Sequence, residues 1–163
     1  MVKIGLLSDT HGYFDDKLKY FFEDVDEIWH AGDIGSLALA DTISRFKPLR
    51  AVYGNIDGTD VRTLYPEFLR FTCEEVDTLI THIGGYPNKY EPKISDLLIK
   101  NPPALLISGH SHILKVIYDK HFSLLFVNSG AAGKYGFHTV RTAIRFSIDN
   151  TEITNMEIGE WKK

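Results

Sequence analysis

The chain lacks disulfide bonds, membrane spans and a strong excess of either charge. Its one cysteine, Cys73, excludes an internal disulfide and fits a reducing compartment, so we expect a cytoplasmic protein. No apolar run approaches the ~20 residues of a membrane span, and residues 1–4 lack the apolar run of a secretory signal. A formal net charge of −4 argues against a dedicated nucleic-acid-binding surface. An anionic substrate stays open, because metal ions can supply local positive charge.

The pattern of apolar residues predicts the fold class. With 163 residues, the chain is long enough for a single domain, 1–163, with a sizeable core. Helices are expected over 13–23, 36–46 and 91–100, and strands over 3–7, 25–30, 49–53, 68–73, 78–81, 104–108, 113–118, 122–128, 140–148 and 151–158. Residues 59–71 are expected to be largely irregular. This order predicts an α/β protein built as a four-layer α/β/β/α sandwich of two mixed sheets flanked by helices, with a simple doubly wound sheet as the alternative.

Five of the apolar runs end in Asp, Asn or His beside glycine. The five segments are Asp9-Thr10-His11, Gly32-Asp33, Gly54-Asn55, His82-Ile83-Gly84 and Gly109-His110-Ser111-His112. Ligands of open α/β sheets bind at the carboxyl ends of strands, and glycine lets the backbone turn sharply there. We therefore expect these segments to meet in one place.

The residue types in these segments fit a metal site. Imidazole, carboxylate and amide ligands suit borderline-to-hard divalent ions, and no thiolate takes part. The candidate ligands are Asp9, His11, Asp33, Asn55, His82, His110 and His112. This set is too large for one tetrahedral ion but fits two ions that share a carboxylate.

Each of these residues alone has a simpler interpretation. Asp9 is a good helix cap, Asp33 and Asn55 are good turn formers, and a single histidine such as His82 or His110 is more often a buried, hydrogen-bonded side chain than a ligand. The joint pattern outweighs these interpretations, because all five segments follow strands in one order.

The five segments resemble the calcineurin-like metallophosphoesterase superfamily. Its pattern of D-x-H, G-D, G-N, H and G-H-x-H stands here as SDTHG, HAGDIG, YGNIDG, THIGG and SGHSH, between residues 8 and 112. The short chain resembles the small bacterial and archaeal phosphodiesterase branch.

The resemblance implies a role for each ligand. Asp9, His11 and His112 would hold one ion, while Asn55, His82 and His110 would hold the other, with Asp33 shared between them. In this family a water that bridges the two ions loses a proton and attacks the phosphorus in line with the leaving group. The usual activating ion in relatives is manganese, and iron, zinc, nickel or cobalt fit the same ligands. Asn55 would also orient a phosphate oxygen.

Two positions depart from the pattern of many relatives. Ile56 stands where many members have a histidine that protonates the leaving group. We therefore expect phosphodiesters with good leaving groups to be better substrates than alkyl monoesters. In the loop from Asn128 to Gly133, Ser129 replaces a frequent proline, and we expect no metal ligand from this loop.

Several further residues are predicted to support the site. Asp57 follows the G-N pair and is expected to contact a ligand histidine, and His30 is expected in the core or behind the ligands. Arg62, Lys89, Lys134 and His138 are candidates for contact with an anionic substrate. A solvated charge is the favoured interpretation for Arg62 and Lys89, and a surface β-region is favoured for His138. His121 is expected in a solvated turn.

Three function classes remain open from the sequence. The first is a two-metal phosphodiesterase acting on a small phosphate ester, and the second is a phosphomonoesterase on the same site. The third is a metal-free scaffold, as in a eukaryotic membrane-trafficking relative of the family that has lost ligand histidines. This chain retains every ligand type, which favours catalysis. No membrane partner is expected, and apolar strands in the last third leave a homodimer open.

Overall fold

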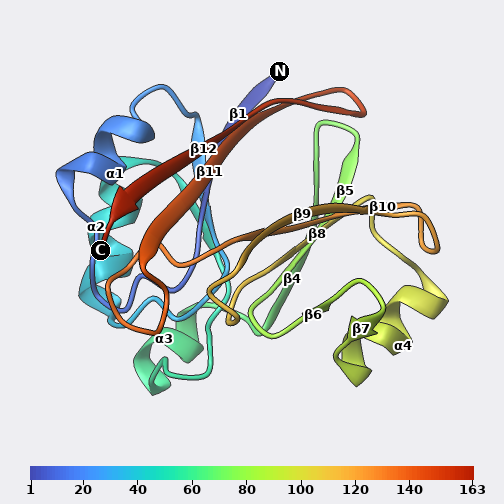
Figure 1. Cartoon of the computed structure of the whole chain (residues 1–163), viewed down its shortest axis with the longest axis horizontal. Coiled ribbons are helices and arrows are strands. Elements are labelled where there is room, and N and C mark those ends of the chain that lie inside the picture. The colour runs from blue at the N-terminus through green and yellow to red at the C-terminus, as the bar shows by residue number, and fades with distance from the viewer.

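Two five-stranded sheets pack face to face in the computed structural model, which describes all 163 residues (Figure 1). The first sheet has the order β12-β11-β1-β2-β3, with bounds Glu152–Lys162, Val140–Asp149, Val2–Leu7, Glu27–His30 and Leu49–Ala51. The second has the order β4-β5-β8-β10-β9, with bounds Phe68–Cys73, Val76–Thr81, Leu105–Ser108, Leu124–Ser129 and Leu114–Asp119. The helices are α1 Asp16–Phe21, α2 Leu37–Phe46, α3 Thr59–Leu64 and α4 Pro92–Lys100.

The main core lies between the two sheets. Side chains alternate along each strand, so Ile4 and Leu6 of β1 face inward and meet Ile80 of β5 and Ile107 of β8. Trp29 of β2 fills the centre of this layer and packs edge-on against other aromatic rings. Many strands form continuous apolar runs in the sequence because helices cover the other face of each sheet, so that side chains on both faces are buried.

Helices cover the outer face of each sheet. Leu7 and Ile28 of the first sheet pack on Phe22 and Ile43, which come from the α1 and α2 segments. On the other side of the molecule, α4 packs its Ile94 and Leu98 on the second sheet (Figure 1). The four layers predicted from the sequence are therefore confirmed, and the doubly wound alternative is excluded.

The strand directions bring the predicted segments to one edge. β1, β2 and β3 run parallel, and so do β5, β8 and β10. The loops after these strands are joined by backbone hydrogen bonds, among them Asp9 N to Gly32 O at 3.0 Å and Gly109 N to His82 O at 2.9 Å. No helix in the structure is long and apolar enough to cross a bilayer.

Three details differ from the sequence-based prediction. The first helix begins only at Asp16, because Asp15 caps it by accepting a hydrogen bond from Leu18 N at 3.1 Å. The irregular region 59–71 contains α3, whose one buried residue, Val61, gives too little apolar pattern to reveal a helix. A small hairpin, β6 Gly85–Tyr86 and β7 Lys89–Tyr90, was not predicted, because two-residue strands carry no alternation.

Candidate metal centre

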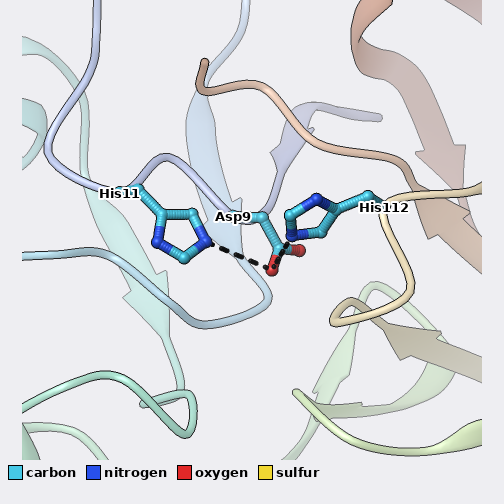
Figure 2. Close-up of side chains that lie close together, drawn as sticks. All are labelled: Asp9, His11 and His112. Carbon is cyan, nitrogen blue, oxygen red and sulfur yellow. Dashed lines mark hydrogen bonds and ion pairs between the residues drawn. The ribbon is translucent and has the colours of Figure 1, made fainter. Parts of the chain in front are cut away.

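The first group of candidate ligands comes from the loops after β1 and β8. Asp9, His11 and His112 offer atoms that lie within 4.8 Å of one another (Figure 2). Nε2 of His112 is 3.1 Å from Oδ1 of Asp9, and Nε2 of His11 is 3.9 Å from the same oxygen. Figure 2 shows both imidazole rings turned toward this carboxylate. The group therefore joins a residue pair from the first sheet to a histidine from the second.

The second group comes from the loops after β2, β5 and β8. Asp33, His82 and His110 also offer atoms within 4.8 Å of one another. Nε2 of His82 lies 3.2 Å from Oδ2 of Asp33 and 3.0 Å from Oδ1 of Asn55, which adds the amide to this group. Nδ1 of His82 lies 2.7 Å from the carbonyl oxygen of Ala31, which can only accept. The other nitrogen, Nε2, is thereby directed at the group.

The two groups are adjacent. Oδ2 of Asp33 is 3.6 Å from Nε2 of His11, and Oδ1 of Asp9 is 3.8 Å from Nε2 of His82. Each carboxylate thus approaches a histidine of the other group. The structure brings together all seven residues that the sequence singled out, and both carboxylates lie close to histidines of both groups.

Five of these residues have a left-handed backbone conformation, which residues other than glycine rarely adopt. The φ angles are 52° at Asp9, 44° at His11, 55° at Asp33, 69° at His110 and 59° at His112. Such left-handed positions are costly and cluster at functional sites, where the surrounding structure holds them. They let each loop turn sharply after its strand and direct the side chain back over the strand ends.

Buried polar residues hold these loops in place. His30 is fully buried: its Nδ1 accepts from Gly32 N at 3.1 Å, and its Nε2 lies 2.8 Å from the Thr10 hydroxyl. Burial lowers the pKa of His30 to about 4, so the ring is neutral at physiological pH. His30 therefore ties together the turns that carry Asp9 and Asp33, behind the ligands as predicted.

Asp57 has a different role from the one predicted. Its carboxylate contacts no ligand histidine and accepts instead from three backbone amides: Ile34 at 3.1 Å, Gly35 at 2.9 Å and Gly54 at 2.8 Å. These amides flank Asp33 and Asn55 in the chain. The prediction failed because the sequence gives no sign of which partners an Asp after a turn will find.

The charges of the site are mutually stabilised. Burial opposes ionisation of Asp9, but hydrogen bonds from His112 and Ser8 and the charge of His82 hold its pKa below the usual value. Burial likewise raises the pKa of Asp33, but the hydrogen bond from His82 outweighs it, so the pKa is lowered. For His82, the bond to Asp33 and both nearby carboxylates outweigh burial and raise its pKa. Both carboxylates are therefore ionised and available to a cation.

One atom indicates that a metal belongs here. Nε2 of His11 is buried and has no hydrogen-bond partner, although carboxylate oxygens surround it at 3.6 and 3.9 Å. Burial lowers the pKa of His11 despite Asp33 and Asp9, which favours the neutral ring that a metal ion requires. A buried nitrogen without a partner is costly unless something binds it. The donor set of imidazoles, carboxylates and an amide fits a divalent ion.

The residues considered for anion contact lie in different settings. The guanidinium of Arg62 donates to Asp57 O at 2.6 Å and Asn55 O at 3.1 Å and covers the Tyr53 ring, so it is already engaged beside the second group. The Lys134 amino group stands 4.6 Å from the centre of the Tyr13 ring. Lys89 is exposed on β7.

His138 is not on a surface strand, which was the interpretation favoured from the sequence. It lies in the loop before β11, where its ring packs edge-on against His112 with 5.1 Å between ring centres. Its Nε2 lies 2.8 Å from Gly133 O, which only accepts. The expectation of a solvated turn for His121 is confirmed.

The end of β10 and the loop that follows it form hydrogen bonds to segments of both ligand groups, a contribution that the sequence did not reveal. The Asn128 amide donates to Gly109 O at 2.9 Å and to the Ser111 hydroxyl at 3.1 Å, within the turn that carries His110 and His112. Gly133 N donates to Asp9 O at 3.1 Å. The only sequence signal was a polar Asn-Ser-Gly ending to an apolar strand.

Comparison with known proteins agrees with this geometry. Residues 2–151 match the family model of the calcineurin-like phosphoesterase superfamily domain. The chain belongs to this superfamily. Family membership and the two ligand groups together support a metal-dependent phosphoester hydrolase.

Individual proteins of known sequence or structure are also similar to this chain. A probable metallophosphoesterase of Methanothermobacter thermautotrophicus is 30% identical over 115 residues, which is 67% of this chain and 66% of that protein, just under two thirds. A solved structure described as a novel archaeal phosphodiesterase aligns over 96% of this chain and 99% of its own, with a TM-score of 0.75 and 20% identity. Vps29 of Chaetomium thermophilum aligns over 100% of both chains, with a TM-score of 0.75 and 17% identity. At these identities the two structures show the fold alone.

Proposed function

We propose that this protein is a two-metal phosphodiesterase that hydrolyses a small phosphate diester. The observation that carries the proposal is the pair of adjacent ligand groups, in which Asp33 approaches His11 of the other group at 3.6 Å. Such a pair fits two divalent ions rather than one. Manganese is the ion we propose, because carboxylate and amide oxygens in the set favour a harder ion than a thiolate site would.

The chain's own residues would hold the ions and the substrate. Asp9, His11 and His112 form one set of ligands and His82, His110 and Asn55 the other, with Asp33 shared. Two divalent ions supply positive charge for the phosphate and lower the pKa of water enough to make it a nucleophile. Their four positive charges exceed the two negative charges of the carboxylates, so an anionic ester is attracted despite the protein's net charge of −4.

Supporting residues fix the ligand atoms before substrate arrives. The Ala31 carbonyl accepts from Nδ1 of His82, and the Ser8 hydroxyl donates to Oδ2 of Asp9 at 2.6 Å. Asn55 is exposed, so its amide can also donate to a phosphate oxygen. Preorganised donors of this kind stabilise charge that develops on the phosphate oxygens in the transition state.

Ile56 supports the choice of a diester over a monoester. Its side chain is 46% exposed beside the second group, and its amide donates to Oδ1 of Asp33 at 3.0 Å. The aliphatic side chain of Ile56 has no proton to give to a leaving group. Ile56→His would introduce a general acid, which typically contributes 10²–10⁴-fold. We expect the ratio of monoester to diester turnover to rise at least tenfold, and an unchanged ratio would contradict this role.

The proposal is tested by turnover and metal content measured together. We expect the protein purified with manganese to hold two ions and to hydrolyse bis(4-nitrophenyl) phosphate, and to lose this activity in a chelator. His112→Ala removes a ligand and is expected to lower activity at least a hundredfold and to reduce the metal content. The matched control is His121→Ala, a histidine in an exposed turn, which should change neither quantity. Turnover that survives complete metal removal would refute the proposal.

A scaffold role is the second candidate. Side chains of Ile117 and Tyr118 on the edge strand β9 are 40% and 59% exposed, and Ile113 before it is 61% exposed. An apolar sheet edge of this kind suits a protein partner, including a second copy of the chain. A metal-free protein with full stability and no turnover of any phosphate ester would favour this candidate. The single buried cysteine leads us to propose the cytoplasm in either case.

A further inference from the structure

An aromatic ring stands exposed at the edge of the metal centre. Tyr135 lies in the loop between β10 and β11, and its ring centre is 4.9 Å from that of His11 at an interplanar angle of 42°. The side chain is nevertheless 70% exposed. One part of the ring therefore contacts a ligand histidine, while the rest faces solvent beside the site.

The position of this ring is fixed by its loop. Gly136 has a φ of 124°, and a Cβ placed there would overlap the His112 ring. The backbone after Tyr135 thus lies directly against a ligand of the first group, which no other residue type at 136 would allow. The amide of Gly133, two residues before Tyr135, donates a hydrogen bond to the Asp9 carbonyl. The loop is held at both sides of Tyr135.

Two partly exposed aliphatic residues adjoin candidate ligands of the second group in the chain. Ile56 follows Asn55 and Ile83 follows His82, and their side chains are 46% and 39% exposed. Ile83 lines a cavity of about 330 Å³ that also includes Asn55, His82 and Arg62. The first ligand group therefore has an aromatic neighbour and the second has aliphatic neighbours.

We propose that Tyr135 is a specificity-determining residue that favours diesters carrying a planar aromatic or heterocyclic group. A phosphodiester has two organic arms, and the exposed ring of Tyr135 stands beside the first ligand group, where one of these arms can reach it. A planar arm placed over the first group packs on the exposed part of the Tyr135 ring, whereas an alkyl arm contributes much less binding free energy there. This inference rests on the proposed function, because it assumes that a phosphodiester binds between the two ligand groups.

Direct binding of two non-hydrolysable probes tests the proposal. Calorimetric titration of the manganese-loaded protein with diphenylphosphinate and with dimethylphosphinate, in which P–C bonds replace the ester bonds, gives the preference for the planar arm. We expect Tyr135→Ala to reduce this preference about 2- to 12-fold, the range of aromatic pairing in proteins. Tyr135→Phe should retain it, because the ring and not the hydroxyl makes the contact.

Phe137→Ala is the matched control. Phe137 lies in the same loop, and its fully exposed ring packs on no ligand, so its removal should leave the preference unchanged. Turnover of bis(4-nitrophenyl) phosphate is measured in parallel and should fall in Tyr135→Ala and not in Phe137→Ala. A preference unchanged in Tyr135→Ala, or lowered equally by Phe137→Ala, would overturn the assignment. Absence of turnover in the wild type would defeat the proposed function, while the binding preference would still decide the role of Tyr135.

Discussion

Removal of the Asp57 carboxylate is expected to weaken the fold and the metal centre together. In Asp57→Ala the amides of Ile34 and Gly54 lose their acceptor in the interior, while the amide of Gly35 lies at an exposed residue and can turn to water. A buried donor left without a partner costs roughly 1–3 kcal/mol, more when the lost acceptor was charged. Two such donors and one weaker loss give a destabilisation of about 4 kcal/mol.

The conservative variant distinguishes hydrogen bonding from other causes. In Asp57→Asn the amide oxygen can occupy the place of Oδ2, which serves both Ile34 and Gly54. Its NH2 group then meets the Gly35 amide, another donor, at the exposed side. We therefore expect a cost of about 1–2 kcal/mol, well below that of the alanine variant.

Urea denaturation in a chelator measures these effects without a contribution from bound metal. With a slope near 2 kcal/mol/M, Asp57→Ala should shift the midpoint by about 2 M. Manganese titration should also show weaker binding, since the amides beside Asp33 and Asn55 are no longer held. Asp60→Ala is the control, because Asp60 is exposed and accepts only from Val61 N at 2.9 Å. A midpoint for Asp57→Ala within 0.5 M of the wild type, or equal losses in Asn and Ala variants, would refute the reasoning.

The remaining predictions concern one glycine and one ion pair. Gly54→Ala places a Cβ where it overlaps the carboxylate of Asp33, so metal content and activity should fall at least tenfold. Gly58→Ala is the control and should retain both, because a Cβ at this position lies 3.3 Å from its nearest atom. Arg141 is buried and ion-paired with Asp15 at 3.0 Å, so Asp15→Asn, which keeps a helix cap, should lose roughly 2–4 kcal/mol at pH 7 in urea unfolding. Burial opposes ionisation of Asp15, but Arg141 lowers its pKa, so this stability is present above the unfolded pKa of about 4 and is lost as pH falls through the lower folded value. The wild type and Asp15→Asn should therefore have the same free energy of unfolding well below pH 4. A difference in this free energy that stays constant with pH would contradict the role given to the Arg141–Asp15 ion pair.

The sequence predicted the convergence of the candidate ligands better than it predicted the residues that position them. Asp9, His11 and His112 follow strands whose ends must meet once the sheets form, so their convergence is a consequence of topology. Asp57 and His138 find partners that depend on loop geometry, which no short-range pattern encodes. The same reason applies to the fold: long amphipathic segments were recognised, and short elements such as α3 were not.

Both ligand groups take side chains from the two opposed sheets. Asp9 and Asp33 extend from one sheet, and His112 and His82 extend from the other. An ion bound by either group therefore cross-links the two halves of the sandwich at the edge where they meet. Part of the free energy of metal binding then opposes separation of the sheets, so loading with metal should slow proteolysis and hydrogen exchange in both halves at once.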